Sequence, residues 1–138
     1  MNVIEQLQHS DIFSELDANE LMDIAPLFHE ASFAENQVLF AEGALADKLV
    51  IVVEGKLSLE KKIQLGRGSG QRARLATTGY VEAGKTAGWP SLTPPHIYTT
   101  SAVALEPTRA LVADGLQLRR HLERNPVVGF KVMTVISM

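Results

Sequence analysis

The stretch ADKLVIVVEG, Ala46 to Gly55, carries the clearest secondary-structure signal in this chain. Its centre, Leu49 to Val53, is an unbroken apolar run rich in β-branched residues, which predicts a β-strand. Glu54-Gly55 follows as a turn signal, because glycine adopts positive φ angles that other residues avoid. The stretch therefore predicts a strand that ends in a tight turn.

Further short strands are predicted on both sides of this run. They cover Val38–Phe40, Leu57–Ile63, Arg72–Thr78, Ile97–Leu105 and Thr108–Val112. Turn signals separate them, and GRGSG, Gly66 to Gly70, predicts a hairpin loop. Short strands at regular spacing are typical of a sandwich, a barrel or a jelly roll.

Helical patterns occupy both ends of the chain. Asp17 and Glu20 have the spacing of a capping box, and helical apolar spacing continues to Phe28. A helix is also predicted over 115–124, and Pro126 suits the first turn of another. We expect one domain over residues 1–138, with N-terminal helices in 1–28, strands in 29–113 and C-terminal helices in 115–137.

Composition and charge exclude several classes of protein. The net charge of −3 argues against a large nucleic-acid surface, and the absence of cysteine excludes disulfides and thiolate metal sites. The four histidines lack metal-ligand spacing, so we expect neither a metal nor a cofactor. With no long apolar run and no signal peptide, we expect a cytoplasmic protein without membrane contact.

The segment GYVEAGKT, Gly79 to Thr86, fits the phosphate-binding loop pattern G-x-x-x-x-G-K-[ST] letter for letter. A working loop of this type follows a buried strand and opens a helix. Here Pro90, Pro94 and Pro95 follow, and they exclude a continuous helix. We therefore interpret the glycines as turn residues. No acid–base or nucleophile constellation stands out either, so we do not expect an enzyme.

The order of the elements and several local motifs together resemble the cyclic nucleotide-binding domain of the catabolite activator and Fnr-type transcription regulators. The motifs are Ile12–Leu16, Leu39–Gly43, Ala46–Gly55, Ala83-Gly84 with Gly88, Ser101–Thr108 and Leu122–Pro126. The resemblance covers about residues 11 to 137. It implies a mainly β fold with flanking helices, an antiparallel β-roll in jelly-roll (double-stranded β-helix) form over 29–113.

The resemblance also implies where a ligand would bind, and there the sequence departs from the family. Members that bind cyclic AMP use a glutamate for the ribose and an arginine for the cyclic phosphate. Trp89 stands at the matching glutamate position, after Gly88, and Tyr98 at the matching arginine position, before Thr99. An indole only donates hydrogen bonds, and a phenol carries no positive charge at neutral pH. We therefore do not expect cyclic AMP to bind in the usual way.

Two interpretations of this altered segment remain open. In the first, the domain is a small-molecule sensor whose ligand, nucleotide-like or another metabolite, contacts Gly88, Trp89, Ser91, His96, Tyr98 and Thr99. In the second, Trp89 and Tyr98 fill the former pocket, and the domain is a ligand-free dimerisation or protein-interaction module.

The C-terminal residues suggest a partner as well. Val128, Val132, Val135 and Ile136 form an apolar stripe on the last predicted helix. In the family that this chain resembles, the same helix of a second subunit covers such a stripe, so we expect a homodimer; packing onto the chain's own roll is the alternative. No helix-turn-helix segment follows before Met138, so we expect no specific DNA binding by these residues.

Overall fold

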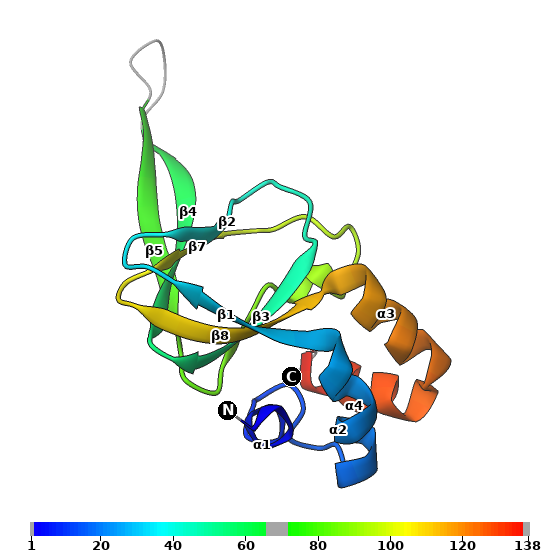
Figure 1. Ribbon diagram of the computed structural model, residues 1–138. Helices are drawn as coiled ribbons and strands as arrows, with labels where there is room; N and C mark the ends of the chain where they lie inside the picture. The colour runs from blue at the N-terminus through cyan, green and yellow to red at the C-terminus, as the bar shows by residue number, and fades with distance from the viewer. Residues whose placement is uncertain (1, 66–71, 137–138) are drawn as a thin grey trace.

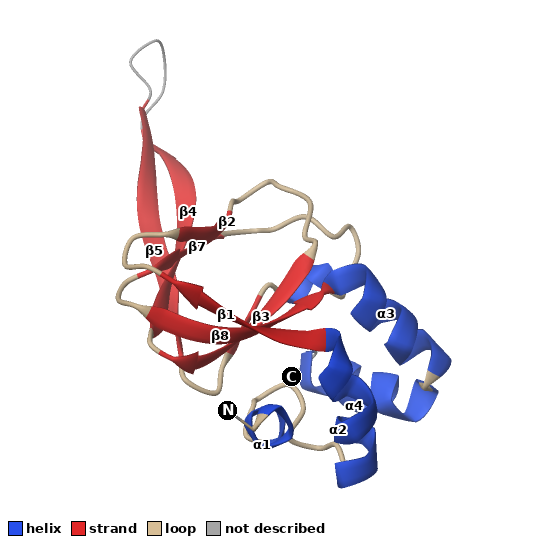
Figure 2. Ribbon diagram, in the orientation of Figure 1, coloured by secondary structure: helices blue, strands red, loops and turns tan. Residues whose placement is uncertain are grey.

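The computed structural model describes residues 2–65 and 72–136, and within them eight strands form two four-stranded sheets (Figure 1). One sheet has the order β1-β8-β3-β6 and the other β2-β7-β4-β5, and every pair is antiparallel. The helices gather at one end of the strands (Figure 2). This arrangement confirms the predicted mainly β roll with flanking helices. The strands are β1 Phe28–Phe33, β2 Val38–Phe40, β3 Lys48–Glu54, β4 Lys56–Leu65, β5 Arg72–Glu82, β6 Thr86–Ala87, β7 Ser101–Ala104 and β8 Thr108–Asp114.

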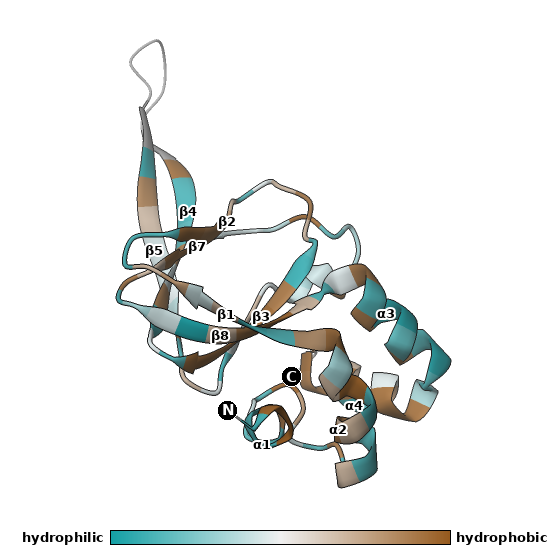
Figure 3. Cartoon of the chain, in the orientation of Figure 1, coloured by the Kyte–Doolittle hydropathy of each residue, from teal (hydrophilic) through white to brown (hydrophobic). Residues whose placement is uncertain are grey.

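Strand β3 lies between the two cores of the protein, which explains its unbroken apolar run. Successive side chains of a strand point to opposite faces of the sheet. Leu49 and Ile51 accordingly join a core formed with the helices, whereas Val50 and Val52 join a core between the two sheets. In Figure 3, β2, β7 and part of β8 are coloured hydrophobic, as strands around the second core must be. A polar residue at any of these four positions of β3 would enter a core.

The turn predicted after β3 is present, and it requires glycine. Gly55 has a φ of 109°, and a Cβ atom on it would lie 2.5 Å from Thr108 Oγ1. Any other residue would therefore strain the backbone and collide with β8. The turn directs β4 away from β3 and into the second sheet.

The N-terminal helices are α1 (Val3–Gln8) and α2 (Ala18–Ile24), followed by a 3₁₀ turn, η1 (Ala25–Leu27). The predicted capping box is confirmed: the Glu20 N–H donates to Asp17 Oδ1 at 2.8 Å, and the Asp17 N–H donates to Glu20 Oε1 at 2.9 Å. The prediction that the helical pattern reaches Phe28 is wrong. Pro26 cannot donate to an α-helical hydrogen bond, and Phe28 begins β1 beside β8.

The C-terminal helices are α3 (Gly115–Arg124) and α4 (Pro126–Ile136), and both begin where the sequence predicted. Val128 and Val132 of α4 are buried in the helical core, so the protein's own domain covers much of the stripe predicted for a partner. The exposed apolar side chains of α4 include Val127 and Phe130 instead. No helix in residues 2–65 and 72–136 is both long and apolar enough to cross a membrane.

Several details of the strands differ from prediction. Strand β5 continues to Glu82, beyond the predicted Thr78, so Gly79, which we interpreted as a turn residue, pairs with Leu59 within the sheet. Strands β1 and β6 carry no clear alternating pattern and were not predicted, and β7 covers only part of the predicted 97–105 segment. Residues 97–100 instead form a loop, in which Ile97 makes a single bridge to Leu45. The predicted hairpin loop at 66–70 lies outside the described residues.

Candidate functional site

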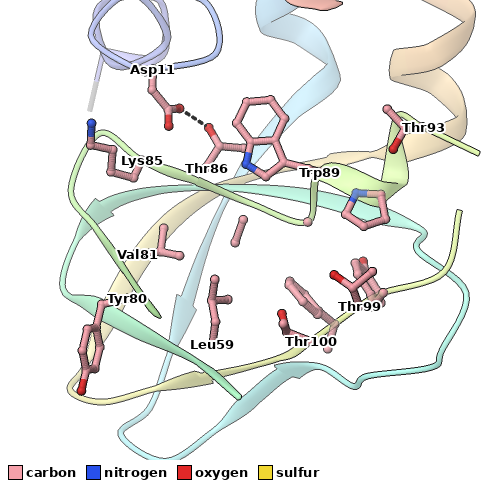
Figure 4. A pocket seen from close by; sticks show the side chains of 15 residues that line it. Asp11, Leu59, Tyr80, Val81, Lys85, Thr86, Trp89, Thr93, Thr99 and Thr100 are labelled. Atoms are coloured by element: carbon pink, nitrogen blue, oxygen red, sulfur yellow. Dashed lines mark hydrogen bonds between the residues drawn. The ribbon is translucent and has the colours of Figure 1, made fainter. Parts of the chain in front are cut away.

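A cavity of about 490 Å³ lies between the second sheet and the loop that follows β5. Strands β4 and β5 supply Leu59, Tyr80 and Val81, and the opposite wall comes from β6 and the 3₁₀ turn η2 (Trp89–Ser91). Figure 4 shows Trp89 and Thr86 on one side of this space, with Leu59, Thr99 and Thr100 on the other. The size is that of a site for a small organic molecule.

The lining of the cavity combines aromatic rings with hydroxyl groups. The aromatic residues are Phe40, Tyr80, Trp89 and Tyr98, and the threonines are Thr86, Thr93, Thr99 and Thr100. Among the described residues that line it, Asp11 and Lys85 are the charged ones, and there is no arginine. The chemistry of the wall therefore suits a largely apolar ligand with a few polar groups.

Gly88 fixes the position of Trp89 at the cavity. It has a φ of 87°, and a Cβ atom on it would lie 2.6 Å from the carbonyl oxygen of Lys48. Only glycine allows η2 to approach β3 this closely. The turn leaves Trp89 half-buried, with part of the indole packed on the helical core and part lining the cavity.

Tyr98 forms a fixed part of the wall. Its ring stacks on Phe40 with centroids 3.9 Å apart and an interplanar angle of 11°, and the side chain is 2% exposed. Its hydroxyl donates to Lys48 O at 2.9 Å and accepts from the Lys48 N–H at 3.0 Å. Burial raises the pKa of Tyr98 to about 12, and the nearby carboxylate of Asp47 acts in the same direction. The phenol is therefore neutral at physiological pH, with its hydroxyl already bonded within the protein.

The structure brings four of the six sequence-predicted ligand residues to the cavity and places two elsewhere. Gly88, Trp89, Tyr98 and Thr99 line it. Ser91 is buried, and its carbonyl oxygen accepts a hydrogen bond from Arg119 of α3. His96 lies against a separate cavity of about 320 Å³, and its Nδ1 is 3.0 Å from the carbonyl oxygen of Pro90.

Sequence reasoning missed Asp11 and Thr86. The Thr86 hydroxyl donates to Asp11 Oδ1 at 2.6 Å, and the Asp11 N–H donates to Gly84 O at 2.9 Å. These bonds place the turn after α1 at the edge of the cavity (Figure 4). The two residues are 75 positions apart, and the GYVEAGKT motif that ends at Thr86 does not include Asp11, so no sequence signal linked them.

Comparison with known proteins identifies the family of this fold. A sequence model of the cyclic nucleotide-binding domain matches residues 30–125, which include most of the cavity wall. The chain belongs to the cyclic nucleotide-binding domain family. This membership implies a ligand-sensing or regulatory role. A comparison with curated proteins gave no significant match.

Solved structures of the family include chains that match this one over most of their length. A protein from Geobacter metallireducens GS-15, provisionally named a cyclic nucleotide-binding protein, is 31% identical with a TM-score of 0.82, over 99% of this chain and 94% of that one. The N-terminal domain of a transcriptional regulator from Streptomyces coelicolor is 25% identical with a TM-score of 0.75, over 95% and 87%. The catabolite activator protein of Thermus thermophilus, at 23% identity and a TM-score of 0.75 over 93% and 57%, shares the fold.

Proposed function

We propose that this protein is a small-molecule sensor domain whose ligand occupies the cavity beside Trp89 and is not a cyclic nucleotide held in the usual way. The observation that carries the proposal is the cavity itself. A space of about 490 Å³ is present although Tyr98 is buried in its wall. This space favours a sensor over a domain in which Trp89 and Tyr98 fill the pocket, because both residues line the cavity.

The lining supports a ligand other than a cyclic phosphate. A desolvated anion needs charge-assisted hydrogen bonds, and arginine supplies them best because its guanidinium binds in a bidentate way. Tyr98 cannot take that part, since its hydroxyl is bonded to the backbone of Lys48. Trp89 has a single N–H donor and no acceptor for a ribose hydroxyl. Lys85, an exposed side chain, is the cation among the described lining residues.

A ligand-free interaction module is the second candidate. The ring stack and hydrogen bonds of Tyr98 are complete without a ligand, as a purely structural residue requires. Helix α4 exposes Val127 and Phe130, at 66% and 75%, and apolar side chains this exposed favour a homodimer contact. The contact would use this face rather than the stripe of Val128 and Val132, which is buried.

A thermal-shift titration with cyclic AMP, cyclic GMP and a panel of metabolites separates the two functions. A sensor should be stabilised by a metabolite, by about 2.7 kcal/mol at a hundred times its dissociation constant. Substituting exposed Thr99 by Trp should narrow the cavity and abolish that shift. The matched control is Thr77→Trp on β5, away from the cavity, which should preserve it. If Thr99→Trp keeps the same ligand-induced thermal shift, the ligand does not bind in this cavity. If no compound shifts the melting temperature, the ligand-free interaction module is favoured.

A further inference from the structure

Asp11 and Lys85 place two opposite charges at one edge of the same cavity. In Figure 4 both side chains lie on the side of Thr86 and Trp89, across the cavity from Leu59, Thr99 and Thr100. Within residues 2–65 and 72–136, neither side chain forms an ion pair with the other or with a third residue. Two charges that line one cavity without neutralising each other are available to a ligand with complementary charges.

The carboxylate of Asp11 is oriented by its surroundings. Its backbone is fixed by the hydrogen bond to Gly84 O, and Oδ1 accepts from the hydroxyl of Thr86, which is buried. Oδ2 has no partner in the part of the chain that the structure describes. A carboxylate accepts about four hydrogen bonds, and charged donors bind it most strongly. A ligand ammonium group would satisfy the remaining oxygen better than a hydroxyl would.

Lys85 supplies the complementary charge. It precedes Thr86, the partner of Asp11, and both charged residues line the same cavity. Its backbone is anchored, because its N–H donates to Glu82 O and its carbonyl accepts from Val52, whereas the described protein gives its Nζ no acceptor. A flexible ammonium on an anchored backbone is suited to a ligand carboxylate at the mouth of the cavity.

The remainder of the cavity is suited to an apolar body. Leu59, Val81 and Ala87 face it together with the stacked rings of Phe40 and Tyr98. We propose that the cavity binds a small zwitterion of the α-amino acid class with an apolar or aromatic side chain: Asp11 receives the ammonium group, Lys85 the carboxylate, and the rings and aliphatic side chains the rest. This inference rests on the proposed sensor function and adds the chemical class of the ligand.

Three probes test the assignment by calorimetric titration of the whole chain. L-phenylalanine carries both charges, 3-phenylpropanoate lacks the ammonium group, and 2-phenylethylamine lacks the carboxylate. L-phenylalanine should bind at least about tenfold more tightly than either analogue, since each lost charge-assisted bond costs about a factor of ten or more. Equal affinity for all three probes would overturn the zwitterion while leaving a sensor of apolar ligands.

Two substitutions should remove the two preferences separately. Asp11→Asn should abolish the advantage of L-phenylalanine over 3-phenylpropanoate, and Lys85→Gln its advantage over 2-phenylethylamine. The controls Asp23→Asn and Lys62→Gln change exposed residues that do not line the cavity, and both preferences should persist in them.

Preferences that survive in Asp11→Asn and Lys85→Gln would overturn the residue assignment. If an uncharged metabolite stabilises the protein and none of the three probes binds, the zwitterion is overturned and the proposed sensor function stands. Binding of a cyclic nucleotide alone would overturn both proposals.

Discussion

Tyr98 and Lys48 exchange two hydrogen bonds, one from the phenol to the Lys48 carbonyl oxygen at 2.9 Å and one from the Lys48 N–H to the phenol oxygen at 3.0 Å. The pair connects the loop before β7 to the first residue of β3. Tyr98, which the sequence predicted to contact a ligand, is therefore bonded to its own fold. These two bonds hold Tyr98 in place as part of the cavity wall.

Removing the Tyr98 hydroxyl should destabilise the protein while leaving the aromatic ring in the cavity wall. Tyr98→Phe keeps the stack on Phe40 but leaves the two backbone groups of Lys48 without their partner. We expect a loss of about 1–3 kcal/mol in the free energy of unfolding, measured by urea denaturation. Tyr80→Phe is the control, because Tyr80 is exposed, and its hydroxyl makes no hydrogen bond within the described residues. Equal stabilities of the two variants would contradict the account.

The raised pKa of Tyr98 predicts a specific dependence of stability on alkaline pH. Below pH 10 the phenol is protonated in both the folded and the unfolded chain, so its contribution is fully present. As pH rises from 10 through about 12, the unfolded chain loses this proton first, and stability falls. We would measure the free energy of unfolding between pH 9 and 12. It should decline more steeply in the wild type than in Tyr98→Phe, because the usual phenol has a pKa of 10.0 and Tyr98 one of about 12. Identical slopes would show that Tyr98 titrates normally.

Gly88 should be the least replaceable glycine at the cavity. Gly88→Ala places a Cβ atom 2.6 Å from Lys48 O on a residue with a φ of 87°. A non-glycine residue in such a conformation costs about 1–3 kcal/mol before any collision. Thermal melting should show a clear loss of stability, and ligand binding should weaken because Trp89 moves. Gly79→Ala is the matched control, since a Cβ atom there meets nothing within 4 Å. If both variants melt like the wild type, the tight approach of η2 to β3 is not important.

The exposed face of α4 predicts self-association. Phe130 is 75% exposed, and Phe130→Ser should lower the dimer fraction in sedimentation equilibrium because it removes apolar area from the proposed contact. Leu75→Ser on β5 is the control, an exposed apolar residue on another element. A wild-type chain that is monomeric at every concentration would reject the dimer, and equal effects of both substitutions would reject this face.

The sequence predicted the fold well where pattern and local chemistry agreed. The run from Leu49 to Val53 forms a strand because it is buried on both faces, and Asp17 and Glu20 form their capping box through contacts three residues apart. Strand β6 was missed because a strand of two residues is too short to show an alternating hydrophobic pattern. Phe28 was assigned to a helix because its spacing fits one, whereas pairing with β8 places it in a strand.

The candidate site was only partly predictable, because some of its contacts join residues that are far apart in the sequence. The resemblance placed Gly88, Trp89, Tyr98 and Thr99 in one segment, and the cavity includes them. Tyr98, however, was considered as a ligand donor, and its bonds to Lys48 depend on a contact 50 residues away. Asp11 reaches the cavity because the turn after α1 is hydrogen-bonded to Gly84 and to Thr86 of β6. Such contacts follow from tertiary structure and leave no local pattern.

The most direct test of the central claim is a calorimetric titration of the wild-type chain with cyclic AMP beside L-phenylalanine and the metabolite panel, with Thr99→Trp as the blocked form. The account predicts no measurable heat of binding with cyclic AMP and saturable binding of another small molecule that Thr99→Trp abolishes. Saturable, one-to-one binding of cyclic AMP to the wild type would contradict it, because the cavity would then hold a cyclic phosphate without an arginine in its described lining.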